Sequence, residues 1–247
     1  MALEEEWSDE PSVCVNGDHL RRIYDYFDES ALETALKLKY ALIAMGSAVR
    51  LSGLTIDSDL KSEKLCERLF AVGYDKITRI VCDDLLFAPH AKAKLLEKYI
   101  KSIPLPDVIL LGMQSSIGGS GQTGPVLAEY LRLPCMTHVS KILPFLDKSL
   151  SVTCAADQET VNANIKGSAV LVIGNAAGSY MRVPTLKALM AVKGKQVETL
   201  TYSKVASYDV LPSKIYRKAP KPVCGFIEGS IEQKAQSLFA IIKGEKA

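Results

Sequence analysis

Apolar and polar residues alternate along the first half of the chain in a way that predicts strands and helices in turn. Phe27 to Met45 carries leucines at mostly helical spacing and is followed by Gly46, a pattern typical of a helix that ends at a glycine. The same reading predicts strands at 48–53, 76–82 and 107–111. It predicts helices between them at 59–72 and 89–102. This alternation favours an α/β fold with a doubly wound, mainly parallel sheet, whose ligands bind at the carboxyl ends of strands.

The second half of the chain has a different pattern. Short β-rich runs at 136–143, 149–155 and 168–173 are followed by a predicted helix at 185–192 and a strand-like run at 196–202. The segment from Tyr208 to Gly229 contains three prolines and little periodicity, which is typical of an extended arm. A last amphipathic helix is predicted at 230–243, and its apolar side packs either on the chain's own core or on a partner. We therefore expect an α/β domain at 1–207 and an arm with a helix at 208–247.

A glycine-rich segment, Gly112 to Pro125, connects the predicted strand at 107–111 to a predicted helix that starts with proline. Backbone N–H groups of such a turn and the positive end of a helix together favour an anion, by default a phosphate. Pro125 and Val126 stand where a P-loop needs Lys and Ser or Thr, so an NTPase of that type is excluded. The GxGxxG spacing at 119–124 lies too far beyond the strand for a dinucleotide fingerprint. A loop whose glycines only form turns is the alternative.

Composition and charge exclude several classes of function. The 247 residues are 48% hydrophobic, but no apolar run approaches the about 20 residues that cross a bilayer. Six scattered cysteines and three scattered histidines show no CxxC or metal-ligand spacing, so no metal site is expected. A net charge of +2 without a basic stripe makes nucleic acid a poor partner. The acidic start, Met1 to Trp7, lacks the features of a secretory signal, and we expect a cytoplasmic protein.

Several motifs, in order along the chain, resemble the beta subunit of electron transfer flavoproteins. FDESALETALKLK from Phe27 to Lys39 resembles the family's NPFDExAxExALxLK helix start, and Asp107 to Gln114 resembles its DLVLLGxQ strand. Gln122-Thr-Gly matches the family's adenine-nucleotide loop. Arg182 to Ala191 resembles the segment that docks on acyl-CoA-type dehydrogenases, and Val223 to Ile242 resembles the arm and helix that wrap the alpha subunit.

This resemblance implies a Rossmann-like fold of the adenine nucleotide alpha hydrolase-like type and a role as the non-catalytic half of a heterodimeric electron carrier. With an alpha subunit, the chain would hold FAD, accept electrons from a flavin dehydrogenase and pass them on or bifurcate them. The glycine loop would hold AMP, or a second FAD in a bifurcating member. Carried over by motif, the residues that line the nucleotide are Phe27, Asp28, Gly53, Gly112, Gln114, Ser120, Gly121, Gln122 and Thr123, and those that dock a dehydrogenase are Arg182 and Leu186. The resemblance implies neither a catalytic residue nor a metal ligand.

Two features depart from the family pattern. Family members open with a strand that ends in a KQVP or KRV turn, whereas this chain starts with Met1-Ala-Leu-Glu-Glu-Glu, so either the start lies upstream or the sheet lacks that strand. Family loops usually read QAIDxDxxQ, whereas the loop from Ser116 to Gln122 has no acidic residue, which removes repulsion from a phosphate. Two other functions stay open: a stand-alone adenine-nucleotide-binding enzyme with His138 or Asp157 as catalytic groups, and a degenerate structural subunit.

Overall fold

A computed structural model of the chain describes residues 23–57, 62–82, 88–116, 118–145, 147, 149–155, 159–176, 180–202 and 226–243. The elements are α1 (Tyr26–Ala44), β1 (Ser52–Asp57), α2 (Glu63–Val72), β2 (Lys76–Val81), α3 (Pro89–Ile100), β3 (Val108–Gly112), α4 (Thr123–Leu131), β4 (Cys135–Pro144), β5 (Leu150–Ala155), β6 (Thr160–Ile165), β7 (Ala169–Ile173), α5 (Leu186–Val192), β8 (Glu198–Thr201) and α6 (Ile231–Lys243). All elements from α1 to β8 belong to one compact unit, and α6 belongs to a second. No helix among the described residues is long and apolar enough to cross a membrane.

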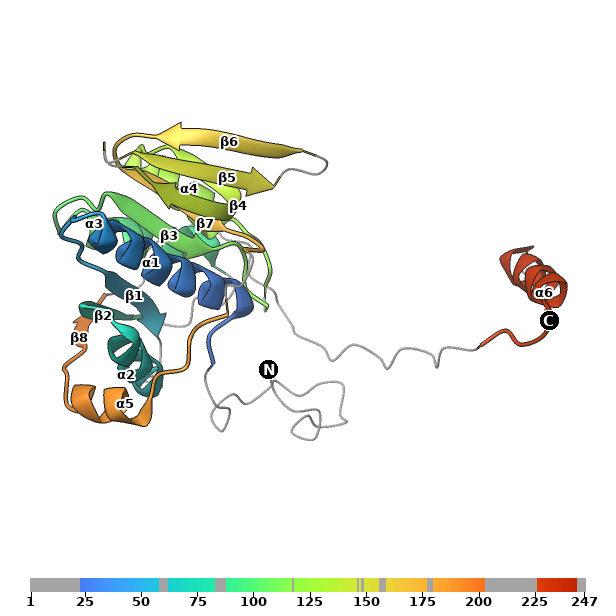
Figure 1. The fold of residues 1–247 in the computed structure, drawn as a ribbon, viewed down its shortest axis with the longest axis horizontal. Helices are drawn as coiled ribbons and strands as arrows, with labels where there is room; N and C mark the ends of the chain where they lie inside the picture. The colour runs from blue at the N-terminus through green and yellow to red at the C-terminus, as the bar shows by residue number, and fades with distance from the viewer. Residues whose placement is uncertain are drawn as a thin grey trace. The chain divides into compact units, whose positions relative to one another are not determined.

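The strands form two sheets, in the order β1-β2-β8 and β3-β7-β4-β5-β6 (Figure 1). All pairs in the first sheet are parallel, as are β3 with β7 and β7 with β4, whereas β5 and β6 are antiparallel additions. The predicted α/β fold with mainly parallel strands is therefore confirmed.

Two strands differ clearly from the prediction. β1 begins at Ser52, four residues beyond the expected start, because Gly53 does not close a turn but lies within the strand against Tyr74. β6 was not predicted, although its apolar residues Val161, Ala163 and Ile165 alternate with polar ones, because the run spans only six residues and contains two asparagines, which are depleted in strands.

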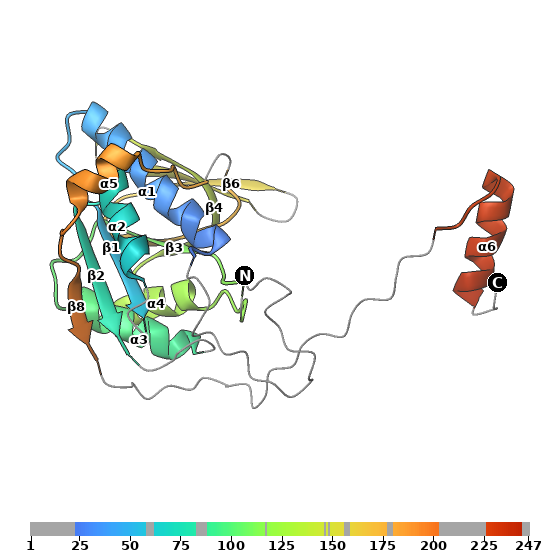
Figure 2. The ribbon, with the colours of Figure 1, turned by 90° about the horizontal axis from the view of Figure 1, so that it is seen from below.

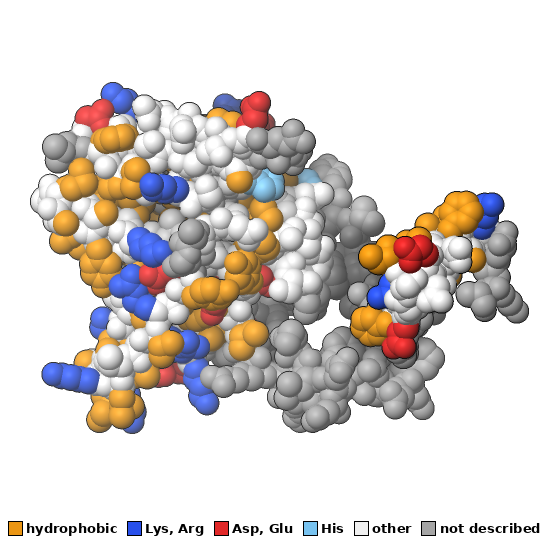
Figure 3. Space-filling model, turned by 45° about the vertical axis from the view of Figure 1, so that its right-hand side comes forward, with side chains coloured by type: hydrophobic (Ala, Val, Ile, Leu, Met, Phe, Trp, Pro, Cys, Tyr) orange, Lys and Arg blue, Asp and Glu red, His pale blue; other side chains and the backbone are white. Residues whose placement is uncertain are grey.

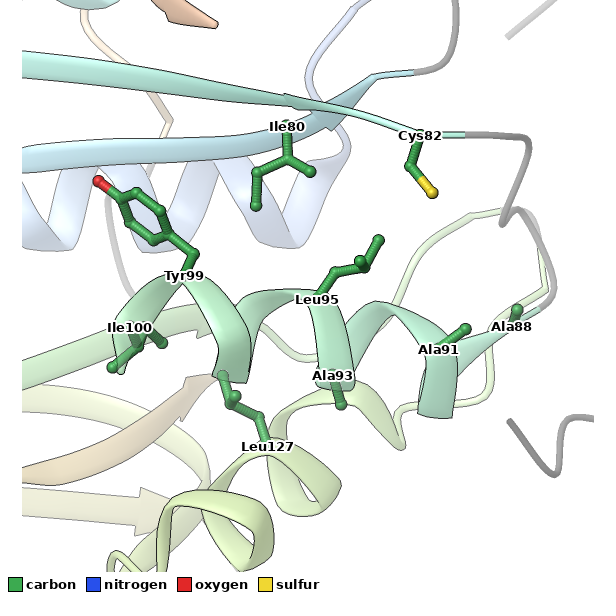
Figure 4. Close-up of a cluster of buried hydrophobic side chains, with 9 residues drawn as sticks. All are labelled: Ile80, Cys82, Ala88, Ala91, Ala93, Leu95, Tyr99, Ile100 and Leu127. Carbon is green, nitrogen blue, oxygen red and sulfur yellow. The ribbon is translucent and has the colours of Figure 1, made fainter. Parts of the chain in front are cut away.

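Helices cover both faces of the three-stranded sheet (Figure 2). Successive side chains of a strand point to opposite faces, so Ile77 and Ile80 of β2 enter different cores. Ile77 packs in a cluster with side chains of α1, α2 and α5. Ile80 packs on the other face against α3, in a cluster that includes Leu95 and Tyr99 (Figure 4).

β7 is the most deeply buried strand of the five-stranded sheet, and all five of its residues are buried. Leu171 and Ile173 share a cluster with Ala31 of α1, whereas Val170 and Val172 pack with Ala128 of α4 on the opposite face. A continuous apolar run is the pattern expected of a parallel strand covered by helices on both sides.

Two strand edges face each other between the sheets. Among the described residues, β1 pairs only with β2 and β3 pairs only with β7. Leu54 of β1 and Leu111 of β3 pack against the same cluster of α3 and α4, so the two edges border one hydrophobic core. We call the line between these edges the seam. The residues that could form the family's first strand precede Ile23 and lie outside the described part of the chain.

Candidate functional site

The carboxyl end of β3 meets the first turn of α1 at unusually short range. A Cβ on Gly112 would lie 2.6 Å from Asp28 Oδ1 and 2.8 Å from the carbonyl carbon of Phe27. Any other residue at this position would push the helix away, and the Gly112 N–H donates a hydrogen bond to the Asp28 carboxylate. The structure thus brings together three residues that the sequence assigned to one site.

The second wall of the site is the N-terminus of α4. A Cβ on Gly124 would lie 2.5 Å from Cγ2 of Val172, so glycine lets this helix approach β7 closely. The first intrahelical bond joins the Val126 N–H to the Gln122 carbonyl at 3.0 Å, and the N–H groups of Thr123 and Gly124 have no partner within the helix. Together with the positive end of the helix, these groups form a binding site suited to an anion. The helix begins two residues before the predicted proline, which the first turn tolerates.

The loop between β3 and α4 owes its shape to glycine. Gly118, Gly119 and Gly121 have φ values of 89°, 50° and 63°, in the left-handed region that other residues rarely adopt. The Ser120 hydroxyl accepts a weak hydrogen bond from the Gln122 N–H at 3.5 Å. The five predicted loop residues therefore lie together, and these are Gln114, Ser120, Gly121, Gln122 and Thr123.

Two carboxylates at the start of α1 border the loop, Asp25 at the N-cap and Asp28 in the first turn. Asp25 Oδ2 accepts a hydrogen bond from the Ser116 N–H at 2.7 Å, so one loop amide is already occupied. Desolvation of its carboxylate by surrounding protein atoms raises the pKa of Asp28 to about 6, and the negative charge of Asp25 adds to this rise. Lys92 and the Gly112 N–H lower the pKa in part. The Asp28 residue as a whole remains accessible to water. The site thus offers acceptors on the α1 side and N–H donors on the α4 side, which suits a ligand with both hydroxyl groups and a phosphate. Sequence reasoning missed Asp25, whose only signal was an acidic residue at the start of a helix.

One predicted residue, Gly53, lies elsewhere. It is the second residue of β1, whereas the loop lies at the carboxyl end of β3. Gly53 is buried, and a Cβ there would contact Tyr74 at 3.4 Å and Leu69 at 3.6 Å. Its small size therefore serves packing in this structure, and its contact with a nucleotide stays a prediction.

The sequence comparisons agree with this architecture. A family model described as the electron transfer flavoprotein domain matches residues 14–205. The chain belongs to the electron transfer flavoprotein family. It is 27% identical over 240 residues to electron transfer flavoprotein subunit beta of Bacillus subtilis, with 94% of this chain and 90% of the relative covered. It is 29% identical over 197 residues to the subunit beta of Megasphaera elsdenii, with 76% of this chain and 69% of the relative covered. Over 199 residues it is 29% identical to that of Syntrophomonas wolfei, with 78% and 75% covered.

The two residues expected to dock a dehydrogenase lie just before α5 and at its first position. Leu186 opens α5 and is 74% exposed, and Thr185 caps the helix by accepting a hydrogen bond from the Ala188 N–H at 3.2 Å. Arg182 is placed differently, because its guanidinium already binds Glu33 of α1, with Nη2 2.6 Å from Oε1. The two residues lie in one segment, but the side chain that is free for a partner is that of Leu186.

Of the two groups proposed for a stand-alone enzyme, only His138 lies in the described part of the chain. His138 lies exposed on β4 with a positive φ of 55°, and its ring contacts Thr137 at 3.3 Å. Asp157 lies outside the described residues. Within the described ranges, no group of three or more His, Cys, Asp or Glu side chains could hold a metal ion. The glycine loop is therefore the candidate site of this electron transfer flavoprotein family member.

Proposed function

We propose that this chain is the beta subunit of a heterodimeric electron transfer flavoprotein, which carries electrons between a flavin dehydrogenase and an acceptor. The observation that carries the proposal is the pair of close approaches at Gly112 and Gly124, which hold the start of α1 against the carboxyl end of β3 and the start of α4 against β7. The names of the relatives support the subunit assignment.

We propose AMP as the ligand of the glycine loop, with a second FAD as the alternative in an electron-bifurcating protein. The N–H groups of Thr123 and Gly124 would hold a phosphate, and Asp28 would accept a hydrogen bond from a hydroxyl or amino group of the nucleoside. The residues present fit such a ligand, because a carboxylate acceptor lies in the first turn of α1 and N–H donors lie in the first turn of α4. The FAD shared with the alpha subunit would supply the redox chemistry, and this chain would help to position it.

The partner surfaces are proposals of the same kind. Leu186 would enter an apolar pocket of an acyl-CoA-type or other flavin dehydrogenase, and exposed Lys187 favours a pocket with acidic groups at its rim. Figure 3 shows apolar side chains beside basic ones at the lower end of the molecule, where Figure 1 places α5. For the alpha subunit we propose α6, in which no residue is buried and which repeats apolar residues at helical spacing, namely Ile231, Ala235, Leu238 and Ile242.

The decisive experiment is to co-express the chain with its alpha subunit, purify the complex, and count FAD and AMP per heterodimer. One FAD and one AMP support a simple electron carrier, and two FAD without AMP support bifurcation. A monomeric chain that binds nucleotide and turns over a substrate alone contradicts the proposal and favours a stand-alone enzyme.

A further inference from the structure

The side chain of Glu33 is one of the few charged groups buried in the described part of the chain, at 5% exposure. Its carboxylate accepts from three donors of one residue, Arg182: the backbone N–H at 3.2 Å, Nε at 3.1 Å and Nη2 at 2.6 Å. Burial by itself raises the pKa of Glu33, but the hydrogen bonds and charge of Arg182 more than offset this, and the pKa lies below its ordinary value. A bidentate pair with an added backbone bond fixes both the position and the direction of residue 182.

The segment that follows Arg182 is held at both ends and exposed between them. Met181 and Val192 are buried in the same cluster, beside Leu36 and Phe70. Between these anchors three apolar side chains project into water, with exposures of 81% at Val183, 74% at Leu186 and 70% at Met190. Apolar side chains exposed this far within ten residues are typical of an interaction surface. We call Val183, Leu186 and Met190 the apolar row.

The side chain of Arg182 is 39% exposed, but its guanidinium is already engaged within the chain. Besides its bonds to Glu33, the guanidinium lies over the ring of Tyr40, with Cζ 5.2 Å from the ring centroid. A guanidinium bound in both ways has a fixed orientation and is already paired. These bonds therefore fix the position of the segment that contains Arg182, at the start of the apolar row.

We propose that the Glu33–Arg182 pair is a positioning device, which fixes the apolar row on α1 in the arrangement that a partner's apolar pocket accepts. Arg182 is then a positioning residue and makes no contact with the partner. This inference rests on the proposed function for the identity of the partner, but the ordering of the row can be measured without one.

The test uses the heterodimer with its alpha subunit and the variants Glu33→Gln, Arg182→Met and the double variant. The first readout is the rate of tryptic cleavage after exposed Lys187, in the middle of the apolar row. Loss of the pair should raise this rate about tenfold in each single variant, and the double variant should be no faster, because both changes break one unit. Asp75→Asn is the matched control, since Asp75 pairs at 2.7 Å with Lys39, which lies on α1 as Glu33 does, without touching the apolar row. It should leave the cleavage rate unchanged.

The second readout is electron transfer from an acyl-CoA dehydrogenase reduced with its acyl-CoA. Glu33→Gln and Arg182→Met should raise KM for the dehydrogenase to a similar extent and leave kcat and flavin content unchanged. If KM rises with Arg182→Met but not with Glu33→Gln, Arg182 contacts the dehydrogenase directly and the positioning role is overturned. An unchanged cleavage rate in Glu33→Gln also overturns the positioning role. Leu186→Ala in the same assay separates the two ideas, because its failure to raise KM refutes the docking segment itself.

Discussion

Replacing Gly124 by alanine tests whether close packing of α4 on β7 builds the site. The new Cβ would lie 2.5 Å from Val172 Cγ2, about 1 Å inside the ~3.5 Å at which two carbon atoms pack best. Val172 is 1% exposed and lies in the most deeply buried strand, so the helix must retreat by about this distance. Overpacking of this kind costs about 1–3 kcal/mol, and the better helix propensity of alanine returns at most about 1 kcal/mol. We expect a net loss of about 1 kcal/mol in the free energy of unfolding, measured by urea denaturation.

A double-mutant cycle with Val172→Ala isolates the contact. Alanine at 172 removes both Cγ atoms, and the nearest remaining atom, its Cβ, lies 3.7 Å from the new Cβ of residue 124, an ordinary contact. The double variant should therefore be more stable than the sum of the single changes predicts, by about 1 kcal/mol or more. Gly124→Ala alone should also lose nucleotide, since the Thr123 and Gly124 N–H groups move with the helix. Additivity of the two single effects within about 0.5 kcal/mol would refute the packing argument, and full nucleotide content in Gly124→Ala would refute the assignment of the phosphate to α4.

Three further predictions concern the charges and the surface. Gly121→Asp should expel the nucleotide by placing a carboxylate in the loop, while Gly121→Asn, which also tolerates the positive φ, should retain it; nucleotide content of the purified complex decides this. Because the pKa of Asp28 rises from 3.8 to about 6 on folding, the folded chain holds a proton that the unfolded chain loses, and stability should fall as pH rises through this window. Asp28→Asn should flatten the dependence of the free energy of unfolding on pH, measured by urea titrations at pH 4 to 7. If the dependence on pH is unchanged, another group causes it. Leu186→Ala should weaken electron transfer with the dehydrogenase and leave flavin content intact, whereas Leu105→Ala, at a leucine that is 54% exposed outside α5, should change neither.

Much of the fold could be predicted because strong local patterns agree with the final packing. The leucines of α1 and the continuous apolar run of β7 identify a helix and a buried strand without any long-range information. The split into two sheets could not be predicted, because it depends on which strands pair and not on the pattern within each. β6 was missed for a related reason: its alternating pattern is short and contains two asparagines, and the strand forms by pairing with β5.

The site shows the same division. The glycine loop could be identified because its residues are contiguous and the φ values demand glycine. Contacts elsewhere join distant residues: the Ser116 amide of the glycine loop meets Asp25 across 91 positions, and Arg182 of the docking segment meets Glu33 across 149. The residues were visible in the sequence, but a motif gives no information on which long side chain meets which. Arg182 therefore entered the prediction as a docking residue with no intramolecular partner.

The seam between β1 and β3 has a consequence for cooperativity. In the described chain, side chains packed around α3 and α4 join the two sheets there, without a ladder of backbone hydrogen bonds. Side-chain packing resists sliding less firmly than paired strands, so the three-stranded and five-stranded sheets can open as separate foldons. In native-state hydrogen exchange the amides of strands with neighbours on both sides, among them β2 and β7, should then persist longer than those of β1 and β3. Any element that completes pairing along the seam would merge the two foldons into one cooperative unit.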